Sequence, residues 1–135
     1  MRDRIFIDSN IWLYLFDVDL SKKSKALSLL KENHFISTQV LSENANVCLR
    51  KFNMSIDDVQ HHLENLSHHC SVLEITQKII FQAFSIHKNY QYSYYDSLII
   101  STALEHDCTM LYSEDMQNGQ LINGQLTIKN PFLGE

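Results

Sequence analysis

The chain has 135 residues, of which 44% are hydrophobic, and its formal net charge is −5. This length and composition indicate a single globular domain, residues 1–135, with a core of its own. The acidic balance argues against a protein that binds nucleic acid through a basic surface, but it is compatible with an enzyme whose acids gather around metal ions.

Three further features narrow the class of protein. Cys48, Cys70 and Cys108 form no CxxC pair and no zinc-ligand spacing, so we predict buried free thiols in a reducing compartment. The first 118 residues contain neither Gly nor Pro, so no Gly-rich phosphate loop is visible there. The N-terminus lacks a leader-like apolar segment, and no apolar run approaches the roughly 20 residues of a membrane span. We therefore expect a cytoplasmic protein.

Short apolar runs alternate with helical periodicity along the chain. In chain order we predict strand 4–7, helix 10–16, helix 21–33, strand 34–37, helix 38–52, helix 55–70, strand 71–75, helix 76–89, helix 93–107, strand 108–113 and strand 126–130. Thr38 is predicted as the N-cap of its helix, and Ser55 begins the next helix with Asp58 three residues later.

Strands that alternate with helices are joined as parallel βαβ units. The predicted fold class is therefore α/β, with a central, short and mostly parallel sheet flanked by helices. In such a sheet, functional residues gather at the carboxyl ends of the strands.

Four acids stand near these strand ends or on mainly apolar helices. They are Asp8, directly after the first strand; Glu43, in the first turns of helix 38–52; Asp96, at the start of helix 93–107; and Asp115, two residues past strand 108–113. Carboxylates brought to one edge repel one another, and the cluster is unfavourable unless cations neutralise it. Oxygen ligands suit Mg²⁺ or Mn²⁺, and such ions activate water for displacement at phosphorus.

Each acid also has a purely structural explanation. Asp8 could be the N-cap of the helix that follows it, and Asp96 could be a first-turn acid that complements the helix dipole. Glu43 could lie on a solvated helix face, and Asp115 could be a turn residue. None of these explanations accounts for the recurrence of carboxylates at one predicted edge.

The segments that carry these acids resemble the PIN-domain nucleases, in particular the VapC-type toxins of toxin–antitoxin pairs. The matching segments are FIDSNIWLYLF, TQVLSENANVCLRK, YYDSLIISTALEHDCTMLYSEDMQNGQ and LTIKNPF. The resemblance implies a PIN-like three-layer sandwich in which Asp8, Glu43, Asp96 and Asp115 form the catalytic and metal-binding quartet. It also implies Mg²⁺ or Mn²⁺, cleavage of RNA, a homodimer and inhibition by a cognate antitoxin. Ser97 stands where the family commonly has Ala.

Polar residues beside the acids are expected to support them. These residues are Ser9, Asn10, Asn46 and Ser113. Their hydroxyl and amide groups could orient a carboxylate or bind a water of the metal, or they could act only as caps. Asn46 follows Glu43 by three residues, so the two share a helix face.

Two other clusters have simpler interpretations. The segment HHLENLSHH, residues 61–69, concentrates four His, and we interpret it as a solvated polar face because no matching zinc ligands accompany it. Four tyrosines precede Asp96: Tyr90, Tyr92, Tyr94 and Tyr95. They either pack in the core or at a dimer contact, or they stack on RNA bases.

The leading hypothesis is a metal-dependent endoribonuclease in which metal-activated water attacks a phosphodiester bond. One alternative is a haloacid-dehalogenase-like phosphatase, but that family has a second Asp two residues after its nucleophile, where this chain has Asn10. The other alternative is a PIN-like protein that binds metal or a partner without catalysis.

Overall fold

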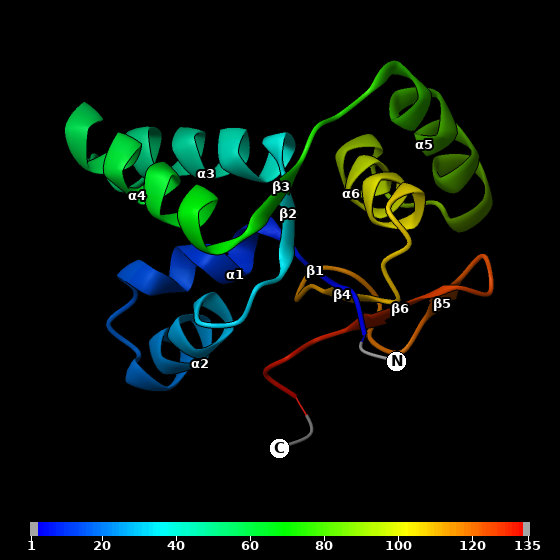
Figure 1. The fold of residues 1–135 in the computed structure, drawn as a ribbon. Helices are drawn as coiled ribbons and strands as arrows, with labels where there is room; N and C mark the ends of the chain where they lie inside the picture. Colours follow the sequence, from blue (N-terminus) through cyan, green and yellow to red (C-terminus); the bar gives the residue numbers. More distant parts are fainter. Residues whose placement is uncertain (1–2, 134–135) are drawn as a thin grey trace.

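Six short strands form one sheet, and helices flank it, in the computed structural model, which describes residues 3–133 (Figure 1). The strands are β1 Ile5–Ile7, β2 Phe35–Ser37, β3 Ser71–Leu73, β4 Met110–Tyr112, β5 Leu121–Ile122 and β6 Leu126–Lys129. The helices are α1 Ser9–Leu13, α2 Leu20–Leu30, α3 Thr38–Arg50, α4 Ile56–His69, α5 Gln77–Tyr90 and α6 Tyr94–Glu105, with a 3₁₀ turn at Tyr14–Phe16. The predicted α/β fold class is confirmed.

The order of the strands creates a crevice beside β1. The sheet runs β3-β2-β1-β4-β6-β5, and every neighbouring pair is parallel except β5 and β6. The chain builds outward from β1 to β3 and then returns to the other side of β1 with β4. Such a reversal leaves an opening at the carboxyl ends of the two central strands, which is where ligands bind in open α/β sheets.

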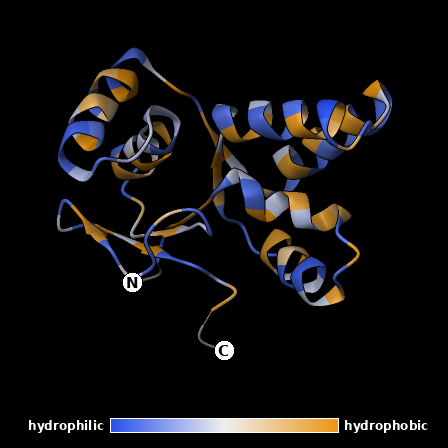
Figure 2. Cartoon of the chain, turned by 180° about the vertical axis from the view of Figure 1, so that it is seen from behind, coloured by the Kyte–Doolittle hydropathy of each residue, from blue (hydrophilic) through white to orange (hydrophobic). Residues whose placement is uncertain are grey.

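Helix α6 has more buried residues than any other helix within residues 3–133. Its residues from Ser97 to Ala103 are all buried, as expected of a helix that is apolar on most of its circumference. It lies side by side with α5, and α3 lies side by side with α4 (Figure 1). The other helices alternate hydrophilic and hydrophobic positions, whereas the central strands are largely hydrophobic (Figure 2).

Side-chain caps fix the beginnings of the helices. The Ser55 hydroxyl accepts the Asp58 N–H at 3.1 Å, which confirms Ser55 as the N-cap of α4. The prediction for Thr38 is wrong, because Ser37 caps α3 and accepts the N–H of Val40 at 3.3 Å. No loop separates β2 from α3, so the last residue of the strand becomes the cap.

Strand β5 was not predicted, although the sequence carries a signal for it. Asn123 and Gly124 both have positive φ, +52° and +68°, between the antiparallel strands β5 and β6. Asn-Gly between two apolar stretches is typical of a two-residue hairpin turn. The two residues of β5 are too short a run to stand out by periodicity alone.

The three cysteines are free and buried, as predicted. Within residues 3–133, the longest helices are too short and too polar to cross a membrane.

Candidate active site

Asp8 lies where β1 ends and α1 begins, and it is only 5% exposed. Its backbone N–H donates to the carbonyl of Tyr112 at 2.9 Å, which ties it to the end of β4. Its Oδ1 accepts the N–H of Ser9 at 2.7 Å, and its Oδ2 accepts the Ser113 hydroxyl at 2.8 Å. Asp8 is therefore the N-cap of α1 and, at the same time, a carboxylate fixed at the opening between β1 and β4.

The four predicted acids line one cavity of about 260 Å³. Its lining residues are Asp8, Ser9, Asn10, Leu13, Glu43, Asn46, Val47, Asp96 and Asp115. We call it the acidic cavity. Of the four predicted supporting residues, only Ser113 is not part of the lining, and it lies behind Asp8 as its hydrogen-bond donor. Among residues 3–133, no Lys or Arg lines the acidic cavity, so no cationic side chain of that part of the chain compensates its carboxylates there.

The supporting residues connect acids that come from different elements. The Ser9 hydroxyl on α1 donates to the Glu43 carboxylate on α3, and the Asn10 amide donates to the Asp115 carboxylate. The Ser113 hydroxyl, besides donating to Asp8, accepts the backbone N–H of Asp115 at 3.2 Å. These contacts hold the acids within one cavity despite their mutual repulsion.

Burial and repulsion make two of the acids reluctant to ionise. Burial raises the pKa of Asp8 to about 7 against the lowering effect of its hydrogen bonds from Ser113 and Ser9, and the charges of Asp96 and Glu43 raise it further. For Asp96, burial is the largest cause of a raised pKa, followed by the charges of Asp115 and Glu43. A cation in the acidic cavity would relieve both effects.

The residues fit a divalent cation by donor type and charge, but not by their present spacing. Mg²⁺ and Mn²⁺ prefer carboxylate oxygens, and the acidic cavity supplies four carboxylates. In residues 3–133, no three His, Cys, Asp or Glu side chains are placed so as to hold a metal ion. Glu43 is turned toward Ser9 and Asp115 toward Asn10. Metal binding would therefore require these carboxylates to leave Ser9 and Asn10 and approach the other acids.

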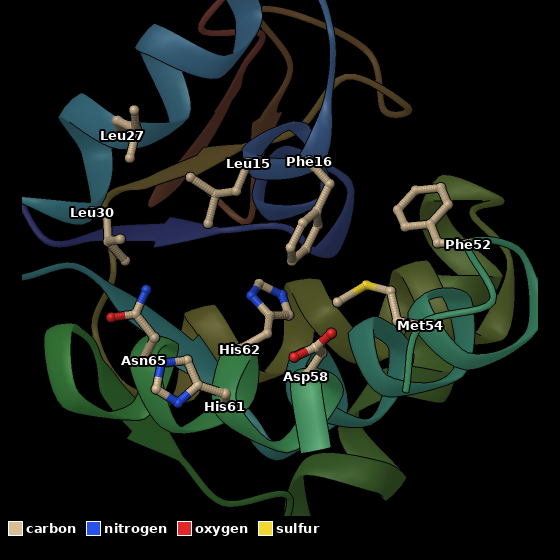
Figure 3. Close-up of a pocket in the computed structure, with 10 residues that line it drawn as sticks. All are labelled: Leu15, Phe16, Leu27, Leu30, Phe52, Met54, Asp58, His61, His62 and Asn65. Carbon is tan, nitrogen blue, oxygen red and sulfur yellow. The ribbon is translucent and has the colours of Figure 1, made fainter. Parts of the chain in front are cut away.

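A second and larger cavity, of about 720 Å³, contains none of the four acids (Figure 3). Its lining residues are Leu15, Phe16, Leu27, Leu30, Phe52, Met54, Asp58, His61, His62 and Asn65. The His62 ring meets the ring of Phe16 edge-on, with centroids 4.8 Å apart. His62 is only 6% exposed, so the prediction of a uniformly solvated His face is wrong at this residue. Its spacing from Val59 and Leu66 places it on the buried side of α4.

His62 is connected to the acidic cavity through the buried side chain of Asn44, which contacts both His62 and Ser9. The Asn44 amide nitrogen donates to the carbonyls of Ser9 and Val40, each at 3.2 Å. These two acceptors fix the amide orientation, so Asn44 Oδ1 faces His62 Nε2 at 2.9 Å and that nitrogen must carry the hydrogen. Burial lowers the pKa of His62 to about 4, which keeps the ring neutral near pH 7.

Neither Asn44 nor His62 was predicted to have a role. The periodicity of α4 would have placed His62 on its buried side, but its partner lies 18 residues away in the sequence. Pairings of that kind depend on how two helices meet, and the pattern of a single helix does not contain that information.

The fold and the acidic cavity together define an α/β domain with carboxylates at the switch point of its sheet. The PIN domain family model matches residues 5–117, so the chain belongs to the PIN-domain family. The resemblance found in the sequence is confirmed, and the haloacid-dehalogenase alternative is set aside. No curated protein matches the chain at a significant level.

Several solved structures share the fold. A toxin–antitoxin complex from Klebsiella pneumoniae matches with a TM-score of 0.72 and 23% identity, covering 95% of this chain and 98% of the other. VapBC2 from Rickettsia felis, bound to a DNA fragment from its promoter, has a TM-score of 0.68 and 17% identity over 93% and 98% of the two chains. Mycobacterium tuberculosis VapC20, a Sarcin-Ricin loop cleaving toxin, has a TM-score of 0.66 and 19% identity over 81% and 88%.

The buried pair predicts a specific double-mutant result. Asn44→Leu leaves the His62 N–H without an acceptor, and His62→Phe leaves Asn44 Oδ1 without a donor, so each is expected to lower the free energy of unfolding by about 1–3 kcal/mol. The double variant, Asn44→Leu with His62→Phe, contains neither the unpaired His62 N–H nor the unpaired Asn44 Oδ1. It should therefore be more stable than the sum of the single effects predicts, by about 0.5–3 kcal/mol. Urea denaturation of the wild type, the two single variants and the double variant measures these free energies of unfolding. Strictly additive effects would contradict the hydrogen bond between Asn44 and His62.

The raised pKa of Asp8 predicts how stability depends on pH in the presence of a chelator. Because the folded state keeps the proton up to about pH 7 while the unfolded state releases it near 3.8, the contribution of Asp8 to stability falls as pH rises between those values. Asp8→Asn removes this titration. The variant should gain stability relative to the wild type from about pH 4.5 to about pH 8, as measured by urea midpoints. An unchanged difference at the two pH values would show that Asp8 is not the titrating group.

Proposed function

We propose that the chain is a metal-dependent endoribonuclease and the toxin of a toxin–antitoxin pair. The observation that carries this proposal is the convergence of four carboxylates in one cavity at the opening between β1 and β4. Membership in the PIN-domain family supports it. The description of VapC20 as a toxin that cleaves the Sarcin-Ricin loop supports RNA as the class of substrate.

Asp8 and Asp96 would hold the principal Mg²⁺ or Mn²⁺ ion, and Glu43 and Asp115 would complete its surroundings. When bound, such an ion supplies Lewis-acid activation of water and neutralises charge on a phosphodiester. Asp8 suits this role because a packed strand and two hydrogen bonds fix its carboxylate. Asp96 suits it because its carboxyl group is half-buried and lies among other carboxylates.

The other residues of the acidic cavity would position the acids. The Ser113 hydroxyl contacts Asp8 and the backbone of Asp115, so it sets the position of one acid relative to the other. Ser9 and Asn10 hold Glu43 and Asp115 in place until a cation competes for them. Asn46, exposed beside Glu43, is available to bind a water or the RNA.

A protein antitoxin and a second copy of the chain are the proposed partners, in a cytoplasmic setting. The matching structure from Klebsiella pneumoniae is described as a toxin–antitoxin complex, which supports the first partner. The net charge of −5 and the acidic cavity favour a basic inhibitory segment. Exposed Phe81 and Phe84 share one face of α5, which supports a homodimer through that face.

Replacement of single acids tests the nuclease. Asp8→Asn and Asp96→Asn should each reduce Mn²⁺-dependent RNA cleavage by on the order of 100-fold or more, because each removes a charged ligand. Chelation should abolish cleavage by the wild type, and added Mn²⁺ should restore it. Asp57→Asn, an exposed acid in the first turn of α4, is the matched control and should leave cleavage unchanged.

RNA fragments should be sequenced at their ends after induced expression, so that the cleaved bonds are identified directly. Full Mn²⁺-dependent cleavage by either acid variant would overturn the assignment. Tight Mn²⁺ binding by calorimetry without any RNA cleavage would instead favour the non-catalytic alternative.

The proposed dimer is tested on α5. Phe81 and Phe84 are 60% and 53% exposed, so replacing both with Glu removes apolar contact area and places charge in the interface. We expect the double variant, Phe81→Glu with Phe84→Glu, to sediment as a monomer at concentrations where the wild type is a dimer. Val18→Glu, at a position 95% exposed, is the control and should leave the dimer intact. A wild type that is monomeric throughout would refute this part of the proposal.

A further inference from the structure

A third cavity lies directly beside the acidic cavity. It measures about 510 Å³, and its lining residues are Gln39, Ser42, Glu43, Asn46 and Tyr95. Glu43 and Asn46 also line the acidic cavity, so the two spaces adjoin. The third cavity is therefore within reach of the unit next to a phosphate that lies at the four acids.

Tyr95 differs from the other tyrosines of the segment before Asp96. The hydroxyl of Tyr90 donates to Asn123, and the hydroxyl of Tyr92 accepts the Gln117 N–H at 3.1 Å. The Tyr94 ring packs against an inner cluster of α5 and α6. The Tyr95 ring meets the Tyr94 ring edge-on, with centroids 5.2 Å apart, but Tyr95 is still 63% exposed and lines the third cavity, so much of its aromatic surface is accessible.

The position of Tyr95 is held by a buried side chain. Gln39 Nε2 donates to the Tyr95 carbonyl at 3.0 Å and to Glu43 Oε2 at 3.2 Å, which ties α3 to the first turn of α6. Both partners are acceptors, so the amide orientation is fixed and Gln39 Oε1 is buried without a partner in the described chain. An unsatisfied buried acceptor is unfavourable, so Gln39 holds the first turn of α6 in place at a cost to stability.

Helix α3 forms a polar wall of the third cavity, and two of the polar side chains on it are available to bind a ligand. Ser42 and Asn46 are exposed, lie one turn apart on α3, and have no side-chain hydrogen bond recorded among residues 3–133. In the part of the chain that the structure describes, no Lys or Arg lines this third cavity, and the acidic residue Glu43 does. An anionic phosphate is therefore disfavoured here, whereas a neutral, flat group with hydrogen-bonding edges is suited to it.

We propose that the third cavity is a nucleobase subsite, in which a base next to the scissile phosphate stacks on Tyr95 and presents its edge to Ser42 and Asn46. The inference rests on the proposed ribonuclease function and adds to it a residue that binds the substrate. Aromatic stacking is available to every base, whereas hydroxyl and amide groups distinguish base edges. Tyr95 therefore supplies affinity, and Ser42 and Asn46 supply preference among bases.

Stacking can be separated from electrostatics with RNA that lacks bases. The probes are fluorescein-labelled decamers of adenosine (A10), of uridine (U10) and of abasic ribose, each titrated by fluorescence anisotropy with Ca²⁺ as the added cation. Gel analysis verifies that the oligonucleotides remain intact. We expect Tyr95→Ala to bind A10 about 5- to 100-fold more weakly than the wild type does. Binding of the abasic decamer should be unchanged, because that probe has no base to stack.

Matched variants identify the cause. Tyr95→Phe keeps the ring and should bind A10 like the wild type, as should Phe52→Ala, which removes an exposed ring from the second cavity. Ser42→Ala, at a position that does not line the acidic cavity, should change the ratio of A10 to U10 affinity and leave abasic binding unchanged. Sedimentation of Tyr95→Ala shows whether it keeps the oligomeric state of the wild type.

Two failures remain distinguishable. If the wild type neither binds nor cleaves RNA, the proposed function itself fails. If the wild type cleaves RNA but Tyr95→Ala weakens A10 and the abasic decamer equally or not at all, only the nucleobase subsite is refuted. A Tyr95→Ala protein with a lower oligomeric mass and unchanged A10 binding would assign the ring to contact with a second copy instead.

Discussion

The burial of one carboxylate, that of Asp8, is the constraint on which the rest of the site depends. A buried carboxylate without a cation is strongly unfavourable unless hydrogen bonds satisfy it or a proton neutralises it. The Ser9 N–H and the Ser113 hydroxyl supply the hydrogen bonds. Because burial raises the pKa of Asp8 to about 7, a proton can also neutralise the carboxylate. Both serines also contact another acid or its backbone, so the groups that stabilise Asp8 also fix the geometry around it.

The sequence was sufficient to predict that the four acids lie close together, because their placement depends on position along the chain. Asp8 follows a buried strand, and Asp96 begins the most apolar helix. Parallel strands with helical crossovers place such positions at the same edge of a sheet. The same argument predicted the fold class and most of the elements, because apolar periodicity is a local property.

What the sequence did not predict depends on contacts between distant segments or on very short elements. Ser37 and Thr38 are both good caps, and only the direct passage from β2 into α3 selects Ser37. Asn44 and His62 look like ordinary polar residues until α3 and α4 pack together and bury both. Gln39 becomes notable only because the first turn of α6 brings the Tyr95 carbonyl within its reach.

Ser9 shows how these long-range contacts support the acids. Its N–H donates to Asp8, its hydroxyl donates to Glu43, and its carbonyl accepts the Asn44 amide. Asn44 is in turn held by His62, whose ring forms part of the wall of the second cavity. A short helix of five residues would otherwise be a poor support for a cluster of charges. The buried amide anchors that helix to α3, the element that carries Glu43.

The same contacts explain why the carboxylates are not arranged at metal-ligand spacing. Without a cation, mutual repulsion favours turning each acid toward the nearest donor, and Ser9 and Asn10 provide donors for Glu43 and Asp115. A bound cation would attract the carboxylate oxygens of Glu43 and Asp115 away from Ser9 and Asn10. The hydroxyl and amide groups released by that change are at the edge of a cavity, where water can satisfy them. Asp8, fixed by β1 and Ser113, would therefore keep its place while Glu43 and Asp115 turn toward a bound cation.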